Sequence, residues 1–172
     1  MKKWMGLLLG LLACSGSAAV AGDFATTVDM RGKGAATFYV QGEIAGLGPV
    51  DLMVDTGSGY TTINEEILER LRGTSHVRYL RKMRGRLANG TEMSVPVYAI
   101  EAVNIGGNCW LNDVEAAVFP GNARPILGLN ALQRTAPFIF SFEPPRLHLS
   151  NCAERTVEAR GNADVAAFES QH

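Results

Sequence analysis

The stretch Leu52-Met53-Val54-Asp55-Thr56-Gly57-Ser58-Gly59 decides the fold of this 172-residue chain. An apolar strand runs directly into a carboxylic acid, and hydroxyl and glycine residues follow. A carboxylate at the end of a buried strand is costly to ionise unless hydrogen-bond donors surround it, and the hydroxyls and glycine amides here can supply them. Gly57 and Gly59 allow a tight turn close to whatever the acid acts on. The pattern indicates a functional carboxylate at Asp55, and the alternative is an acid that caps a turn.

Only one such loop occurs in the chain, and this bears on its assembly. One carboxylate does not easily serve as both general base and general acid. Two carboxylates at hydrogen-bonding distance share a proton, because both cannot ionise together. A two-fold axis beside the loop would bring Asp55 of two copies face to face. We therefore expect activity to require a homodimer.

Alternating apolar and polar residues predict that most of the chain forms strands. Asn64 is a good helix N-cap, and Gly73 can end the short helix that follows it. The pair Asn89-Gly90 is a strong hairpin signal. The predicted elements are strands over 37–44 and 50–54, the helix between Asn64 and Gly73, a hairpin over 77–103, a strand over 114–119, a buried run over 125–128, a helical turn over 129–134, and a closing hairpin of 138–142 with 146–149.

Two motifs carry a resemblance to a known family. Val54-Asp55-Thr56-Gly57-Ser58 resembles the active-site loop of aspartic proteases, and Ile126-Leu127-Gly128 resembles the hydrophobic-hydrophobic-glycine element that packs behind that loop. Their order and separation are similar to those of single-lobed retropepsins. The run Ile105-Gly106-Gly107, with Val114 and 129–132, resembles the bacterial exported branch. Over residues 36 to 150, the resemblance implies a mainly β, single-lobed retropepsin-like acid protease barrel with one or two short helices.

The resemblance also implies a function, that of an aspartic endopeptidase that acts on peptides or proteins. Paired Asp55 carboxylates would hold and activate one water, without cofactor or metal. Thr56 would brace the opposite loop, Gly57 would present backbone groups near the substrate, and Ser58 would donate to the outer carboxylate oxygen. The hairpin tip at Ala88, Asn89 and Gly90 lies where the family carries its substrate-covering flap. The alternative is a catalytically inactive module that keeps the fold for peptide binding or dimerisation.

Residues 1–21 have the pattern of a secretory signal, with Lys2 and Lys3, an apolar run over 7–13, and Ala19-Val20-Ala21 before the expected cleavage. We expect an exported, periplasmic or secreted domain over 22–152 and a flexible tail over 153–172. The alternatives are a lipoprotein acylated at Cys14 and a membrane anchor. The apolar run is far shorter than the roughly 20 residues that span a bilayer, so we expect no stable membrane span in the mature chain.

Cysteines, charge and histidines narrow the remaining classes. In an oxidising compartment Cys109 and Cys152 are expected to form a disulfide, and the alternative is two unrelated buried cysteines. The chain has 16 basic and 17 acidic residues, and loss of the signal removes two of the basic ones. The net charge that remains is weakly negative, which argues against nucleic acid as a partner. The three histidines have no ligand spacing, so no metal site is expected.

A cluster of basic residues precedes the tip of the predicted central hairpin and comprises Arg78, Arg81, Lys82, Arg84 and Arg86. The cluster either favours acidic substrates or solubilises an exposed arm.

Overall fold

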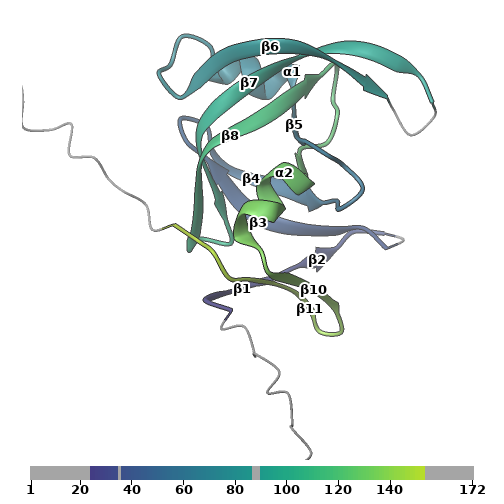
Figure 1. Ribbon diagram of the computed structural model, residues 1–172, viewed down its shortest axis with the longest axis vertical. Coiled ribbons are helices and arrows are strands. Elements are labelled where there is room, and N and C mark those ends of the chain that lie inside the picture. The colour runs from purple at the N-terminus through teal and green to yellow at the C-terminus, as the bar shows by residue number, and fades with distance from the viewer. Residues whose placement is uncertain (1–23, 35, 87–89, 154–172) are drawn as a thin grey trace, which may run out of the picture.

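The chain folds into a mainly β, single-lobed structure, shown by a computed structural model that describes residues 24–34, 36–86 and 90–153 (Figure 1). Two short helices and one 3-10 turn accompany the strands. In chain order the elements are β1 (Thr26–Asp29), β2 (Arg31–Gly32), β3 (Phe38–Ile44), β4 (Gly48–Val54), β5 (Thr61–Asn64), α1 (Glu65–Leu71), β6 (Val77–Arg86), β7 (Glu92–Ile105), β8 (Cys109–Phe119), β9 (Ile126–Leu127), α2 (Leu129–Leu132), η1 (Gln133–Thr135), β10 (Phe138–Phe142) and β11 (Pro145–Leu149).

The larger sheet closes on itself. Its strand order is β2-β3-β4-β9-β5-β8-β7-β6, and β3 also pairs with β7, so the strands between them form a barrel. Strand β6 lies outside this closure, and among the strands that the structure describes it pairs only with β7. A smaller sheet of order β1-β11-β10 lies below the barrel in Figure 1. This architecture confirms the predicted fold class.

The helix after Asn64 forms as the sequence predicts. The Asn64 side chain accepts a hydrogen bond from the Ile67 amide at 2.9 Å and so caps the first turn. One face of α1 is buried against the barrel through Ile67, Leu68 and Leu71. Gly73 follows the last turn with φ of 78°, a left-handed conformation that favours glycine. The helix thus begins and ends where its capping residues indicate.

The predicted central hairpin is formed by β6 and β7, which pair in antiparallel register from Val77 opposite Ile100 to Arg86 opposite Glu92. The predicted tip residues Ala88 and Asn89 lie outside the described residues, and Gly90 is exposed. Strand β8 begins five residues before the expected Val114. The polar pair Asn112-Asp113 hides this start, because Asp113 has a positive φ of 49° where the pairing with β7 is interrupted.

Cys109 and Cys152 form a disulfide, which is the first of the two alternatives considered for them. The bond joins the start of β8 to the segment after β11. Ala153, expected to begin the tail, forms an antiparallel bridge with Trp110. The predicted signal segment and residues 154–172 lie outside the described residues. Within the described part of the chain, no helix is long and apolar enough to cross a bilayer.

Candidate active site

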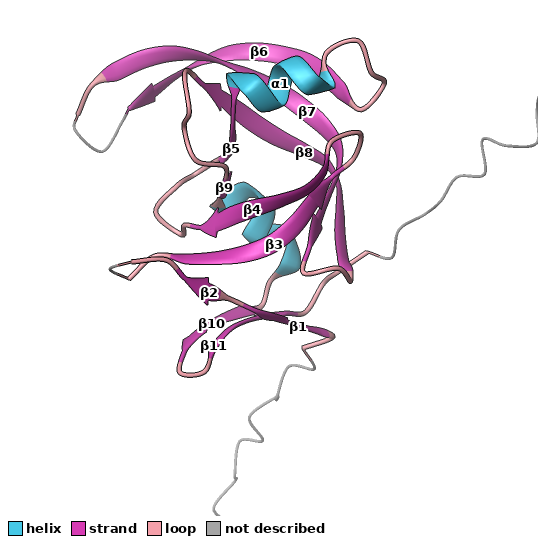
Figure 2. Cartoon of the chain, turned by 180° about the vertical axis from the view of Figure 1, so that it is seen from behind, coloured by secondary structure: helices cyan, strands magenta, loops and turns pink. Residues whose placement is uncertain are grey.

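Asp55 lies where β4 ends, at the start of the loop that leads to β5 (Figure 2). Its backbone amide donates to the Leu127 carbonyl at 3.2 Å, and its side chain is half-buried. The Gly57 amide donates to Asp55 Oδ1 at 2.8 Å. A backbone N–H directed at this oxygen stabilises the charged form of the carboxylate. The loop thus supplies one of the donors that the sequence predicts.

The predicted role of Ser58 is wrong for this structure. Its hydroxyl donates to the Tyr60 carbonyl at 2.8 Å and not to a carboxylate oxygen of Asp55. The Ser58 amide donates to the Asp55 carbonyl at 3.3 Å and so closes a tight turn. Thr56 and Gly57 are exposed at the surface of the loop. Ser58 therefore fixes the shape of the loop, and Gly57 supplies the donor to the acid.

Ile126, Leu127 and Gly128 lie directly behind the Asp55 loop, where the sequence places them. Strand β9 is parallel to β4, with Val54 opposite Leu127, and antiparallel to β5. Leu127 is fully buried. A Cβ atom on Gly128 would lie 2.3 Å from both the carbonyl carbon and the carbonyl oxygen of Tyr60. Only glycine fits this approach, so the motif sets how closely the two segments pack.

Asn130 is a structural residue of the site that the sequence reasoning did not identify. Its Oδ1 accepts from the Thr61 amide at 2.7 Å and from the Thr61 hydroxyl at 3.0 Å, and its Nδ2 donates to the Glu115 carbonyl at 2.7 Å. Its own amide donates to the Gly59 carbonyl at 3.2 Å. The side chain of Asn130 therefore joins α2 to β5 and β8, and its backbone amide holds the end of the Asp55 loop. A polar residue two positions after the glycine of the apolar-glycine motif was the available signal.

The β6–β7 hairpin extends on the same side of the molecule as the Asp55 loop, as both overall views show (Figures 1 and 2). The hairpin therefore lies where it could cover a molecule bound at the loop. Two members of its basic cluster are ion-paired in the structure, Arg81 with Glu115 and Arg86 with Glu92. A hydrogen bond from Arg81 holds the pKa of Glu115 below its usual value.

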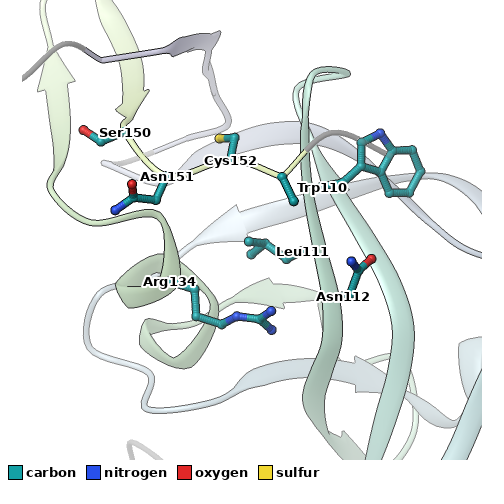
Figure 3. Close-up of a pocket in the computed structure, with 8 residues that line it drawn as sticks. Trp110, Leu111, Asn112, Arg134, Ser150, Asn151 and Cys152 are labelled. Atoms are coloured by element: carbon teal, nitrogen blue, oxygen red, sulfur yellow. The ribbon is translucent and has the colours of Figure 1, made fainter. Parts of the chain in front are cut away.

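Two pockets differ in their relation to Asp55. A pocket of about 410 Å³ begins at the downstream end of the loop and is lined by Gly59, Tyr60, Asp113, Val114, Glu115, Leu129, Asn130, Gln133 and Arg134. The pocket of about 360 Å³ in Figure 3 lies beside the disulfide, between Trp110, Arg134 and Cys152. No residue of the Asp55 loop lines this second pocket. The first pocket is the one that adjoins the candidate site.

The histidines are apart in the structure as well. His76 contacts Glu101, His148 shares a hydrogen bond of 3.0 Å with Thr27, and His172 lies outside the described residues. Among residues 24–34, 36–86 and 90–153, no three His, Cys, Asp or Glu side chains gather in a way that could hold a metal ion.

Comparisons with known proteins agree with this geometry. Residues 40–134 match the family described as "gag-polyprotein putative aspartyl protease". A retropepsin-like aspartic protease from Rickettsia conorii is 20% identical, with a TM-score of 0.54 over 74% of this chain and 91% of that one. The retroviral protease-like domain of Ddi1 from Leishmania major is 23% identical, with a TM-score of 0.50 over 68% of this chain and 90% of that one. No curated protein matches the chain.

The family match covers more than half of the chain and contains the Asp55 loop, the β6–β7 hairpin and the Ile126-Leu127-Gly128 element. The two solved structures share its fold. The chain belongs to the gag-polyprotein aspartyl protease family and has the retropepsin-like fold.

Proposed function

We propose that this protein is an aspartic endopeptidase whose active form is a homodimer with an Asp55/Asp55′ dyad. The observation that carries the proposal is the placement of Asp55. It directly follows the barrel strand β4, accepts from the Gly57 amide, and donates its own amide to the Leu127 carbonyl of the Ile126-Leu127-Gly128 element. The chain supplies one such loop, so the second carboxylate comes from a second copy.

In the proposed mechanism the two carboxylates share one proton and hold a water between them. The ionised carboxylate takes a proton from the water as its oxygen attacks the scissile carbonyl, and the protonated carboxylate then delivers its proton to the leaving nitrogen. The Gly57 amide stabilises the charged carboxylate. Thr56 is exposed on the loop, which suits its proposed contact with the partner's loop.

The substrate is an extended peptide held between the β6–β7 hairpin and the Asp55 loop. The hairpin extends on the loop's side of the molecule, which supports this assignment (Figure 2). The exposed backbone of Gly57 is available to a peptide laid across the loop. The proposed cleavage of a peptide requires the dimer, because a single Asp55 lacks the second carboxylate.

Asp55→Asn tests the proposal against a matched control. We expect the variant to lose cleavage of a peptide library at acid pH, because the amide cannot take a proton from water. The control is Asp51→Asn, also on β4, whose carboxylate is ion-paired with Arg31 and Lys33 at the surface. This variant should keep its activity. Cleavage by Asp55→Asn, or equal loss in both variants, would overturn the assignment.

Sedimentation tests the dimer directly. Residues 22–172 should sediment as a dimer, and a statine-type inhibitor should shift the equilibrium further toward it, because the inhibitor binds both halves of the dyad. A monomer that ignores the inhibitor, yet binds peptides without turnover, would identify the alternative, an inactive peptide-binding module.

We also propose that the protein is exported. The Cys109–Cys152 disulfide supports this location, because such bonds persist mainly in oxidising compartments. Mass spectrometry of the protein from its native host should find an N-terminus at Gly22. An acylated N-terminus at Cys14 would instead identify a lipoprotein, and an intact Met1 would contradict cleavage.

A further inference from the structure

Three side chains from separate elements meet beside the Asp55 loop. Arg81 of β6 forms two parallel hydrogen bonds with Glu115 of β8, Nη1 to Oε1 at 3.1 Å and Nη2 to Oε2 at 2.6 Å. The same Nη2 donates to the Tyr60 hydroxyl at 3.1 Å. Tyr60 lies at the end of the Asp55 loop, directly before β5. We call this set the Tyr60–Arg81–Glu115 cluster.

The cluster bypasses the strand between its members. Strand β6 is an edge of the large sheet, and within the described part of the chain its strand pairing ties it to β7 alone. Arg81 lies opposite Val97 of β7, and Val97 lies opposite Ala117 of β8. The guanidinium reaches past β7 to β8 and to the loop. It therefore adds a second attachment between the hairpin arm and the barrel.

A β-bulge puts Arg81 on the face where it can do this. The register between β6 and β7 shifts by one residue between Tyr79 and Arg81, so Arg81 lies opposite buried Val97. Without the extra residue Leu80 would occupy that position, and Arg81 would face the other side of the sheet. The fold thus directs a cation, and not the preceding leucine, toward Glu115 and Tyr60.

The other cations of β6 differ from Arg81. Arg86 pairs with Glu92, its cross-strand neighbour on β7, so its ion pair stays within the hairpin. Among the described residues, the side chains of Arg78, Lys82 and Arg84 form no ion pair. General solubilisation of an exposed edge strand accounts for these cations. Solubilisation does not account for Arg81, which bonds both to Glu115 and to Tyr60 of the Asp55 loop.

We propose that Arg81 is a positioning residue that couples the β6 arm of the hairpin to the Asp55 loop through Tyr60 and Glu115. With the cluster formed, the arm and the loop keep a fixed separation, and a peptide that enters between them meets a formed site. When the cluster is absent, the β6 arm moves independently of the Asp55 loop, and binding of the peptide must then order the arm. The kinetic consequence rests on the proposed peptidase function, but the coupling itself does not.

Hydrogen–deuterium exchange of the full chain tests the coupling without any need for activity. In Arg81→Ala we expect exchange to rise about threefold, the scale of an exposed ion pair, in peptides that cover both 55–62 and 77–86. The matched control is Arg86→Ala, which removes an ion-paired arginine from the same strand. It should leave the loop peptide at the wild-type rate. Equal loop exchange in Arg81→Ala and wild type, or the same rise in Arg86→Ala, would overturn the proposal.

Kinetics separate positioning from general stability. Arg81→Ala and Tyr60→Phe should each raise KM for a cleaved peptide while kcat stays within about twofold, because the lost contact orders the site for binding. The double variant should be no worse than either single one, since both remove the same link. Arg81→Lys should not restore KM, because lysine lacks the planar fork. A fully additive double variant, or rescue by lysine, would contradict the coupling.

Discussion

The Asp55 loop and the β6 arm lie on the same side of the molecule but are held in different ways. The loop is enclosed by β4, β9 and β5, and receives hydrogen bonds from the backbone of Leu129 and Asn130. Strand β6 has no buried residue along its ten positions and pairs on one edge. Local stability follows buried contacts, so the loop should open less readily than the arm. The fold thus combines a tightly held acid with a less tightly held hairpin arm.

The largest effect should come from the packing behind the loop. In Gly128→Ala the new Cβ would meet the Tyr60 backbone at 2.3 Å, and a backbone neighbour cannot rotate away. We expect a loss of about 3 kcal/mol in the free energy of unfolding, the upper range for overpacking. Urea unfolding measures it. Gly59→Ala is the control, because a Cβ there meets nothing within 4 Å. Similar unfolding midpoints for both variants would show that the loop is less tightly held than the geometry indicates.

Much of this contrast was predictable from the sequence. An apolar run that ends in an acid, followed by small residues, specifies a strand and a tight loop, and Asn89-Gly90 specifies a hairpin whose arms the structure shows. The capped helix after Asn64 was predictable for the same reason. These features depend on neighbours in the chain, and local chemistry determines them.

The remaining features depend on contacts between distant segments. Ser58 donates to Tyr60 because of the exact path of the loop, which residue type does not determine. Asn130 acts through Thr61, 69 residues away in sequence. Arg81 reaches Glu115 only because a β-bulge changes the face on which it lies. Periodicity cannot reveal such a bulge, since strict alternation places Arg81 on the opposite face.

An intermediate effect should come from Asn130. In Asn130→Ala the Thr61 amide and the Glu115 carbonyl lose their partner, and Thr61 is 1% exposed. Leaving buried groups unpaired should cost about 2 kcal/mol in the free energy of unfolding. In Asn151→Ala, the control, an exposed side chain loses one bond to the Ala136 carbonyl, and the change should be smaller. Exchange in the loop peptide should rise in Asn130→Ala and not in Asn151→Ala. A rise in the β6 peptide without a rise in the loop peptide would show that Asn130 does not hold the loop.

The smallest effect should be a pH-dependent release of the β6 arm. A hydrogen bond from Arg81 holds the pKa of Glu115 below its usual value of 4.5. A carboxyl whose pKa is lowered by folding stabilises the fold above its unfolded pKa, and that contribution is lost as pH falls through the lowered value. The difference in unfolding free energy between wild type and Glu115→Gln should therefore be constant from neutral pH to about pH 5 and should vanish in more acidic solution.

The effect is small because the side chains of Arg81 and Glu115 are 43% and 39% exposed, and water screens the pair. Asp113 and Arg134 line the same pocket, so each pH series needs an Asp113→Asn background to isolate Glu115. Urea unfolding across this range measures the difference, and exchange in residues 77–86 locates it. Because the loss begins below the usual pKa of a glutamate, the cluster stays formed through mildly acidic solution and releases the arm only under stronger acid. A difference that persists below the lowered pKa would mean that Glu115 acts through packing and not through its charge.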